Sequence, residues 1–365
     1  MLSATLIRNL LEIRKETISL RSVYKFGGSS IKSAAAIKQI ADLILACPND
    51  ALVVLSATYN STNELESIYF SEDSNLLVED FFTKHRVIIE ELNLQVDLSN
   101  FKEELLSYLT LPKSSSTLDS IYSIGERIST SILASYIQQQ GRELFHADAR
   151  DYILTNRNFN EAKVLFKNTK ANCKDLNKHS LIITQGFIAR TTDGQTSTLG
   201  REGSDYSAAI FAWALDDVQE LVIWKDVKGV YGHDPKVLSN APLIHNLSYR
   251  QTKLLTNKGA KILFHRTMNP LIEANLPLIV KSVFYPNEAG SCISDAKEDH
   301  FCAISTERDE ASRNFITVFG LPLENAKLLE RSFEVDENND DYFTLEVDGQ
   351  DLREWIDLFG DQLFS

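Results

Sequence analysis

Apolar residues near the start of the chain alternate between two patterns. A short apolar stretch at residues 22–26 ends in GGSS, and residues 34–47 then carry apolar side chains at the spacing of one helix face. A continuous apolar run, ALVVLSA, follows at residues 51–57. Strand, glycine turn, helix and strand form a βαβ unit. Continuously apolar strands indicate a parallel sheet that is covered on both faces.

The same alternation continues along the chain. Residues 64–140 have the apolar spacing of helices, and further short strands are predicted at 181–188, 220–226 and 276–283. A glycine-containing loop leads into a helix that starts near Tyr206. Ahead of the first strand, residues 1–21 read as an amphipathic helical extension. Their two acidic residues, Glu12 and Glu16, argue against a targeting peptide.

The pattern changes after residue 295. A polar connector is followed by predicted strands at 301–305 and 315–320, a helix at 324–333, a strand at 341–348 and a helix at 351–359. This order predicts a small α+β module. We therefore expect three parts: an extension over 1–21, a catalytic domain over 22–295 and a short regulatory or assembly module over 296–365.

Composition and charge narrow the classes of function. The chain has 365 residues and a net charge of −14, which disfavours nucleic-acid binding because phosphate contacts need clustered Lys and Arg. No apolar run approaches the roughly 18 residues of a membrane-spanning helix. The four cysteines are scattered without CxxC spacing, as expected of reduced thiols in the cytoplasm, and no metal site is expected from them.

Candidate chemistry begins at the end of the first predicted strand. Lys25 precedes Gly27, Gly28 and Ser29, whose backbone N–H groups can approach an anion at the start of a helix. The lysine could neutralise phosphoryl oxygens, although a simple turn with an exposed lysine also fits this segment taken alone. The Walker A pattern does not occur.

Two further segments carry charged residues between glycines or at strand ends. In GREGSD at 200–205, Arg201 offers a planar fork for a carboxylate, while Ser204 and Asp205 stand where a helix cap is expected. In WKDVKGVY at 224–231, Lys225, Asp226 and Tyr231 follow a strand end, where ligands of α/β sheets collect.

Taken together, these segments resemble the aspartate kinase family within the amino-acid kinase superfamily. The matching segments are VYKFGGSS, VVLSATYNSTNEL, SIGERIS, TQGFIA, STLGREGSDYSAA, VIWKDVKGVYGHDP, GAKIL and LPLIVKS. They occur in family order and cover about residues 22–293. The resemblance implies a three-layer αβα sandwich with a mostly parallel sheet, the amino-acid kinase fold, followed by a small α+β, ferredoxin-like (ACT-like) module.

The resemblance also assigns roles to residues. It implies a substrate site formed by Ser56, Thr62, Glu126, Arg201, Ser204 and Asp205, with Glu126 on the amino group of aspartate and Arg201 on its α-carboxylate. It implies nucleotide contacts from Lys25, Gly27, Gly28, Ser29, Lys225, Asp226, Tyr231, Lys236, Lys261 and Ile262. Lys25, Arg201, Asp205 and Asp226 are the expected catalytic group.

Three positions depart from the family pattern. Glu202 replaces a glycine that is common in the substrate loop, Tyr59 stands in a segment where glycine is common, and Phe264 takes the place of a histidine. These departures keep a catalytically weakened regulatory paralogue open as an alternative. Another amino-acid kinase, acting on glutamate or N-acetylglutamate, is the second alternative.

The implied reaction transfers the γ-phosphoryl group of ATP to the side-chain carboxylate of L-aspartate, giving 4-phospho-L-aspartate, the first step of lysine, threonine and methionine biosynthesis. Mg²⁺ is expected to enter with the nucleotide, without a protein site of its own. The expected partners are L-aspartate, ATP and further copies of the chain in a homodimer or larger homo-oligomer. About 70 residues after the catalytic domain suffice for one ACT-like module, so weak feedback inhibition is expected.

Overall fold

The computed structural model describes residues 20–47, 50–260, 265–295, 300–326, 328, 333–338 and 341–364. The expected N-terminal helix falls almost entirely outside these residues, as does the expected boundary at 296. No helix in the described ranges combines the length and the apolar character that crossing a membrane requires.

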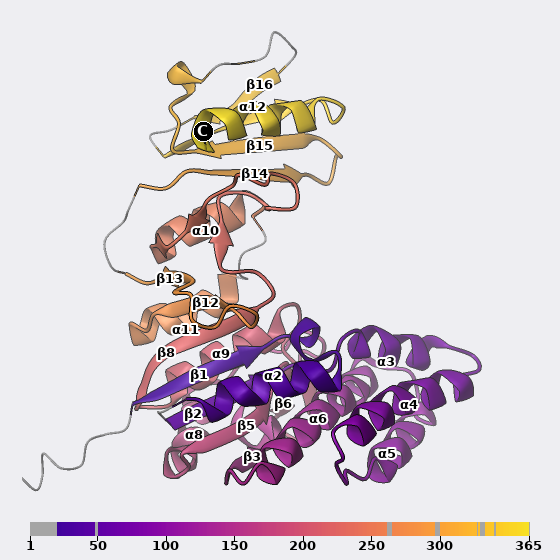
Figure 1. The fold of residues 1–365 in the computed structure, drawn as a ribbon. Helices are drawn as coiled ribbons and strands as arrows, with labels where there is room; N and C mark the ends of the chain where they lie inside the picture. The colour runs from indigo at the N-terminus through magenta and orange to yellow at the C-terminus, as the bar shows by residue number, and fades with distance from the viewer. Residues whose placement is uncertain are drawn as a thin grey trace, which may run out of the picture.

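A central sheet of eight strands organises the catalytic domain, in the order β11-β13-β12-β8-β1-β2-β5-β3 (Figure 1). Along the chain these strands are β1 (Arg21–Phe26), β2 (Asp50–Leu55), β3 (Phe145–Ala147), β5 (Leu181–Gln185), β8 (Val218–Lys225), β11 (Asn246–Leu247), β12 (Leu278–Ser282) and β13 (Ser291–Ile293). Every neighbouring pair is parallel except β12 with β13. The prediction of a mostly parallel sheet is confirmed.

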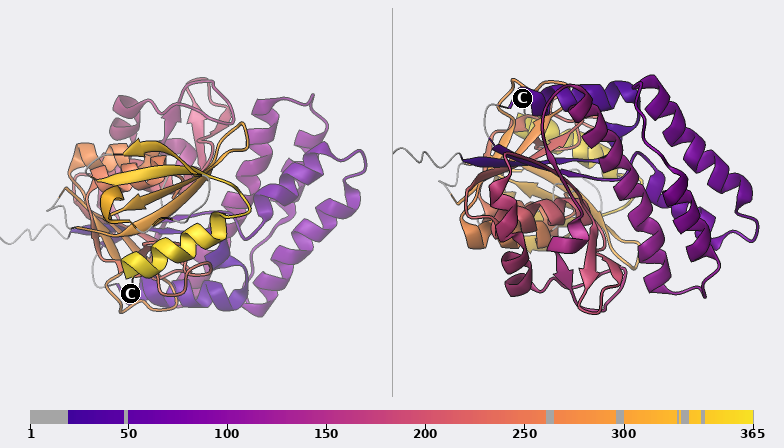
Figure 2. Two further views of the ribbon diagram at one scale, coloured as in Figure 1. Left: turned by 90° about the horizontal axis from the view of Figure 1, so that it is seen from above. Right: turned by 90° about the horizontal axis from the view of Figure 1, so that it is seen from below.

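Helices cover both faces of this sheet and complete three layers. One face carries α2 (Ala34–Leu45), α3 (Ser61–Phe70), α4 (Asn75–Glu91), α5 (Ser99–Leu109) and α6 (Ser115–Gln139). The other carries α7 (Ala149–Tyr152), α8 (Phe166–Cys173), η2 (Lys174–Lys178), α9 (Gly203–Ala214), α10 (Tyr249–Asn257) and α11 (His265–Ala274). Helices α3, α4 and α5 extend to one side of the sheet (Figure 2).

Two small sheets lie beside the main one. Strands β4 (Leu154–Thr155), β6 (Ile188–Thr191) and β7 (Thr196–Thr198) form the first, and β9 (Val230–Tyr231) pairs with β10 (Leu243–Ile244) in the second. The single strand predicted at 181–188 is therefore divided. Phe187 has a φ of +68°, a left-handed conformation that turns the chain out of β5 before β6 begins.

The C-terminal module is an antiparallel sheet in the order β14-β15-β17-β16, covered by α12 (Leu352–Phe364). Its strands are β14 (Ala303–Arg308), β15 (Asn314–Phe319), β16 (Phe333–Asn338) and β17 (Tyr342–Val347). The helix predicted at 324–333 is wrong at both of the ends that the structure describes. Its first two residues belong to a short 3-10 turn, η3 (Leu323–Asn325), and Phe333 starts β16, whose backbone groups pair with β17. Residues 327 and 329–332 lie outside the described residues.

This module packs directly on the segment that follows β8. Leu238 and Ala241 belong to the same apolar cluster as Trp355 and Phe359 of α12. The backbone N–H of Ile304 donates to the Gly232 carbonyl at 2.7 Å. The module and residues 232–241 therefore share one core, consistent with the stacked arrangement in Figure 1.

Candidate active site

A cavity of about 540 Å³ opens at the carboxyl ends of β1 and β2. Its lining includes seven residues that the sequence placed in the substrate or catalytic site: Lys25, Ser56, Thr62, Glu126, Arg201, Ser204 and Asp205. They come from β1, the loop after β2, α3, α6, the loop before α9 and the start of α9. Because parallel strands end at one edge of a sheet, the fold brings these distant segments together.

Lys25 and Asp205 form an ion pair across the floor of this cavity. The Nζ–Oδ1 distance is 2.7 Å, and the two side chains are 11% and 2% exposed. Among the described residues, Asp205 Oδ1 has this ion pair and no further hydrogen-bond partner. Asp205 lies in the first turn of α9, where the helix dipole also stabilises a negative charge.

Glu126 of α6 is a buried carboxyl group in the same cavity. Burial raises its pKa well above the ordinary value, while the charge of Lys25 and a hydrogen bond from the Ala57 backbone act in the opposite direction. Its Oε2 has no hydrogen-bond partner among the described residues. A cationic ligand group in the cavity would satisfy this oxygen and favour the ionised carboxylate.

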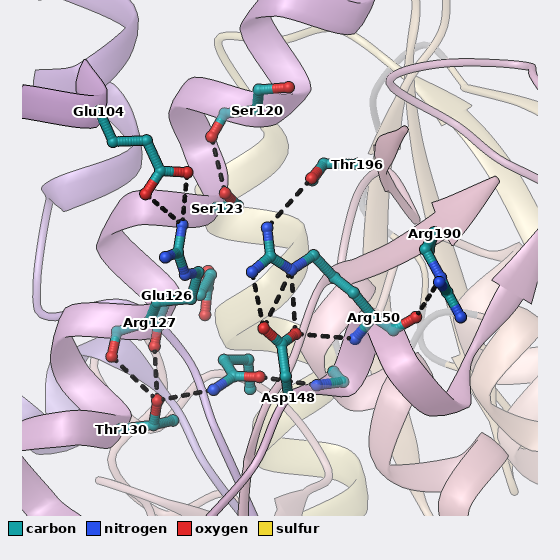
Figure 3. A network of polar contacts seen from close by, with 12 residues as sticks. Glu104, Ser120, Ser123, Glu126, Arg127, Thr130, Asp148, Arg150, Arg190 and Thr196 are labelled. Carbon is teal, nitrogen blue, oxygen red and sulfur yellow. Dashed lines mark hydrogen bonds and ion pairs between the residues drawn. The ribbon is translucent and has the colours of Figure 1, made fainter. Parts of the chain in front are cut away.

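Contacts on the adjoining face of α6 fix the rotation of the helix (Figure 3). Arg127 donates to both oxygens of Glu104 on α5 at 2.8 Å. The Thr130 hydroxyl donates to the Glu126 carbonyl at 3.1 Å and accepts a bond from Gln185 at the end of β5 at 2.9 Å. These links to α5 and β5 hold α6 in the orientation that turns Glu126 into the cavity.

A buried chain of hydrogen bonds supports the loop after β2. His85 Nδ1 donates to the Phe81 carbonyl at 2.7 Å, so the neutral ring accepts at Nε2 from the Thr58 hydroxyl at 2.8 Å. Thr58 in turn contacts the hydroxyl of Ser61 at 2.6 Å, and Lys84 donates to Ser61 at 3.0 Å. The chain lies between Ser56 and Thr62, the two cavity residues that this part of the molecule contributes.

The loop between β7 and α9 adopts a strained backbone. Glu202 has a φ of +54° and caps α9 in the left-handed region. A glycine, which the family resemblance implies at this position, would adopt this conformation without strain. The Arg201 side chain is exposed and makes no hydrogen bond or ion pair with any described residue. Its guanidinium group is available to a ligand in the cavity.

Apart from Lys25, the residues expected around the nucleotide lie outside this cavity lining. Gly27 precedes η1 (Gly28–Ile31), to which Gly28 and Ser29 belong, and a Cβ on Gly28 would lie 2.9 Å from the Ala57 carbonyl oxygen. Lys225 ends β8 next to β1, and Tyr231 lies in β9, while Asp226 and Lys236 are exposed. Lys261, Ile262 and the departing Phe264 are outside the described residues. The roles of these residues stay predictions.

Sequence reasoning missed several cavity residues. They are Glu66, Leu118, Tyr122, Asn160, Phe187 and Thr198. It also missed Asp119, a fully buried aspartate that accepts hydrogen bonds from Thr198, at the start of the loop between β7 and α9. A signal was present, because Asp119, Ser123, Glu126 and Thr130 recur at the spacing of one helix face, and all four are buried. Such a polar stripe is usually read as the solvent face of a helix.

Residues 21–282 match the amino acid kinase family, which is well over half of the chain. The chain belongs to this family. Within it, the chain is a member of the aspartokinase group, as its resemblance implied. It is 30% identical over 327 residues to the lysine-sensitive aspartokinase 3 of Escherichia coli, covering 82% of this chain and 73% of that protein. It is 35% identical over 277 residues to an aspartokinase of Chlamydia pneumoniae, covering 74% of this chain.

The chain spans 62% of that chlamydial protein and 65% of the aspartokinase of Chlamydia trachomatis. Among solved structures, the fold is similar to E. coli aspartokinase III in complex with aspartate and ADP, described as the R-state. The TM-score is 0.81 at 21% identity, with 94% of this chain and all of that chain covered. This similarity confirms the αβα fold with its small C-terminal module.

Proposed function

We propose that the chain is an aspartate kinase, which transfers the γ-phosphoryl group of ATP to the side-chain carboxylate of L-aspartate. The observation that carries the proposal is the composition of the cavity. One space holds a buried cation, two buried carboxyl groups and an unengaged arginine, supplied by Lys25, Asp205, Glu126 and Arg201. Family membership and the named relatives support the same reaction.

The charges of the cavity suit an amino acid that is anionic at two positions and cationic at one. The Arg201 guanidinium offers two parallel N–H donors to an α-carboxylate. The free Oε2 of Glu126 is a partner for an ammonium group. A side-chain carboxylate placed near Lys25 is already ionised at neutral pH, so the acceptor needs no general base.

Lys25 would then act on the group being transferred. Its ammonium is preorganised by Asp205 at 2.7 Å and is positioned to neutralise charge that develops on phosphoryl oxygens. Catalysis of this kind depends on placing the acceptor in line and on stabilising charge. Both tasks fall to residues that already line the cavity.

Mg²⁺ is part of the proposal as a companion of the nucleotide. Within the described ranges, no three His, Cys, Asp or Glu side chains gather closely enough to hold a metal ion. In our proposal, the nucleotide phosphates supply the main ligands. When bound, the ion would neutralise phosphate charge, and we assign no protein ligand to it.

An ADP-release assay with L-aspartate, L-glutamate and N-acetyl-L-glutamate tests the proposal. We expect turnover with aspartate at least tenfold above the other two acceptors. The amino and α-carboxylate groups are held at fixed points in our proposal, so a side chain of only one length places its carboxylate at Lys25. Hydroxylamine in the same reaction should trap the acyl phosphate as a hydroxamate. Faster turnover with glutamate or N-acetylglutamate would reassign the substrate, and no turnover with any acceptor would support a regulatory paralogue.

A further inference from the structure

Asp119 is a fully buried carboxylate that accepts hydrogen bonds from three donors and forms no ion pair with any residue in the described ranges. It accepts the backbone N–H of Thr198 at 2.8 Å and the Thr198 hydroxyl at 2.8 Å. It also accepts the backbone N–H of Asn160, which lies 3.0 and 3.2 Å from its two oxygens. A buried acid without a cation is costly to fold, so an aspartate at this position calls for a specific reason.

The donors belong to the two segments that shape the loop carrying Arg201. Thr198 ends β7, three residues before Arg201. Asn160 has a φ of +66°, and its carbonyl oxygen lies under Gly200, where a Cβ would be 3.2 Å away. Thr198 and Asn160 both line the cavity. Asp119 therefore holds the base of the substrate loop in place from beneath.

A second side chain holds the same loop from the other side. Arg266 of α11 donates to the Leu199 carbonyl at 3.2 Å and to the Ala162 carbonyl at 3.3 Å. Its guanidinium also lies over the ring of Tyr206 at 4.9 Å. The loop is thus clamped between an acid that accepts its N–H groups and a base that binds its carbonyl groups.

Asp119 also shares a helix with the other half of the proposed site. Glu126 follows it by seven residues on α6, about two helical turns or 10 Å along the same face. Helix α6 therefore carries Glu126, the proposed partner of the ammonium group. Through Asp119 it also anchors the loop with Arg201, the proposed partner of the α-carboxylate. The distance between the two partners depends on the bonds of Asp119.

We propose that Asp119 is a positioning residue, which sets the spacing between Glu126 and Arg201 and thereby the affinity for the amino-acid substrate. This inference rests on the proposed function for the identity of the substrate. It concerns a residue that touches neither ligand and acts through the loop. Its effect is therefore expected on the amino acid and not on the nucleotide.

Asp119→Asn tests the proposal, because an amide presents N–H donors to a site that holds three donors already. We expect the KM for L-aspartate to rise about tenfold or more, as loss of a buried charged hydrogen bond implies. The KM for ATP should change less than twofold. Direct binding of L-aspartate, measured by calorimetry, should weaken by the same factor. Thr198→Val keeps the shape of the side chain and removes one of the three donors to Asp119, so we expect a smaller increase in the KM for L-aspartate.

Asp217→Asn is the matched control. Asp217 pairs with the fully buried Arg21 at the start of β1. This amino-terminal end of the strand is the end away from the cavity. This variant should lower the thermal stability while both KM values stay within twofold. If it shifts the two constants as Asp119→Asn does, general destabilisation accounts for the effect and the proposal is overturned.

A double-mutant cycle that combines Asp119→Asn with Arg201→Lys tests whether Asp119 acts through the loop that carries Arg201. If Asp119 acts through the loop, the combined variant should lose less affinity than the product of the two single losses. Multiplicative losses, or equal increases in both KM values, would refute the positioning role. If the wild type prefers a different amino acid, the proposed function fails on its own, and the same cycle is run with that acceptor.

Discussion

Acidification should destabilise the chain through His85, whose ring is buried at the Thr58 end of the hydrogen-bond chain behind the cavity. Burial, together with the charge of Lys84, lowers the pKa of His85 from 6.5 to about 4. The unfolded chain therefore binds a proton as the pH falls below 6.5, while the folded chain does not do so until about pH 4. Stability from this group is complete above pH 6.5 and is lost across that window.

The expected loss follows from the size of the shift. At pH 5 the group is protonated in the unfolded state and mostly neutral in the folded state, which costs about 2 kcal/mol relative to pH 7. Below pH 4 the full loss approaches about 3 kcal/mol. Protonation would also reverse the hydrogen bond to Thr58, because a charged ring donates at both nitrogens.

Urea unfolding of the wild type and of His85→Gln, at pH 7 and at pH 5, measures this contribution. The variant should be less stable than the wild type at pH 7 but should lose about 2 kcal/mol less on acidification. His300→Gln is the control, since this histidine is exposed and the variant should lose as much as the wild type. Equal losses in the wild type and in His85→Gln would refute the reasoning.

Four further predictions concern the site and its surroundings. Lys25→Ala should lower kcat by at least about a hundredfold in the ADP-release assay while the circular dichroism spectrum stays native, because charge neutralisation at the phosphoryl group is removed; near-normal turnover would exclude Lys25 from the mechanism. Arg201→Lys should raise the KM for L-aspartate about tenfold and that for ATP far less, since lysine lacks the bidentate fork; equal shifts would give Arg201 a structural role. Glu202→Gly should increase the free energy of unfolding by about 0.5 to 1 kcal/mol by relieving a φ of +54°, whereas Glu202→Ala should not, and a gain in both would contradict the strain argument. Gly259→Ala should raise the KM for ATP several-fold, because the added Cβ would lie 2.5 Å from the Thr306 carbonyl oxygen and so displace Gly259, which precedes the predicted nucleotide contacts Lys261 and Ile262 in the sequence. Gly194 has a similar φ and open space around it, so Gly194→Ala should change stability alone.

The sequence was sufficient to place the residues that follow strands. Lys25 and Ser56 stand at the ends of continuously apolar runs, and such ends meet at one edge of a parallel sheet. Their convergence in one cavity is a consequence of that pattern. Arg201, Ser204 and Asp205 could be predicted to belong to the same site only because the family resemblance gave the order of the segments.

Residues on helices were harder to place. Asp119 looks like part of a solvent face, because nothing in the sequence shows that α3, α5 and the small β4-β6-β7 sheet cover α6 on its polar side. Tyr122 and Glu66 were missed for the same reason, since both lie on helices and line the cavity only after α3 and α6 pack together. Burial of a polar helix face is a property of the assembled fold and not of the local pattern.

The error in the C-terminal module has a different origin. Residues 324–333 have apolar spacing compatible with a helix, yet Phe333 and Val335 form part of an edge strand beside β17. Pairing with β17 depends on residues that come later in the chain. Short segments of mixed pattern are decided by such partners more than by their own propensity.

The central position of β1 has a consequence for how the chain is made. β1 pairs on one side with β2, which follows closely, and on the other with β8, about 200 residues later. At typical rates of synthesis of 5 to 20 residues per second, about 8 to 34 s separate the emergence of these two partners from the ribosome. During that interval the apolar strand β1 has one unpaired edge, the kind of surface that recruits other chains. Folding yield during synthesis should therefore depend on how well the nascent chain protects β1 until residue 225 has emerged.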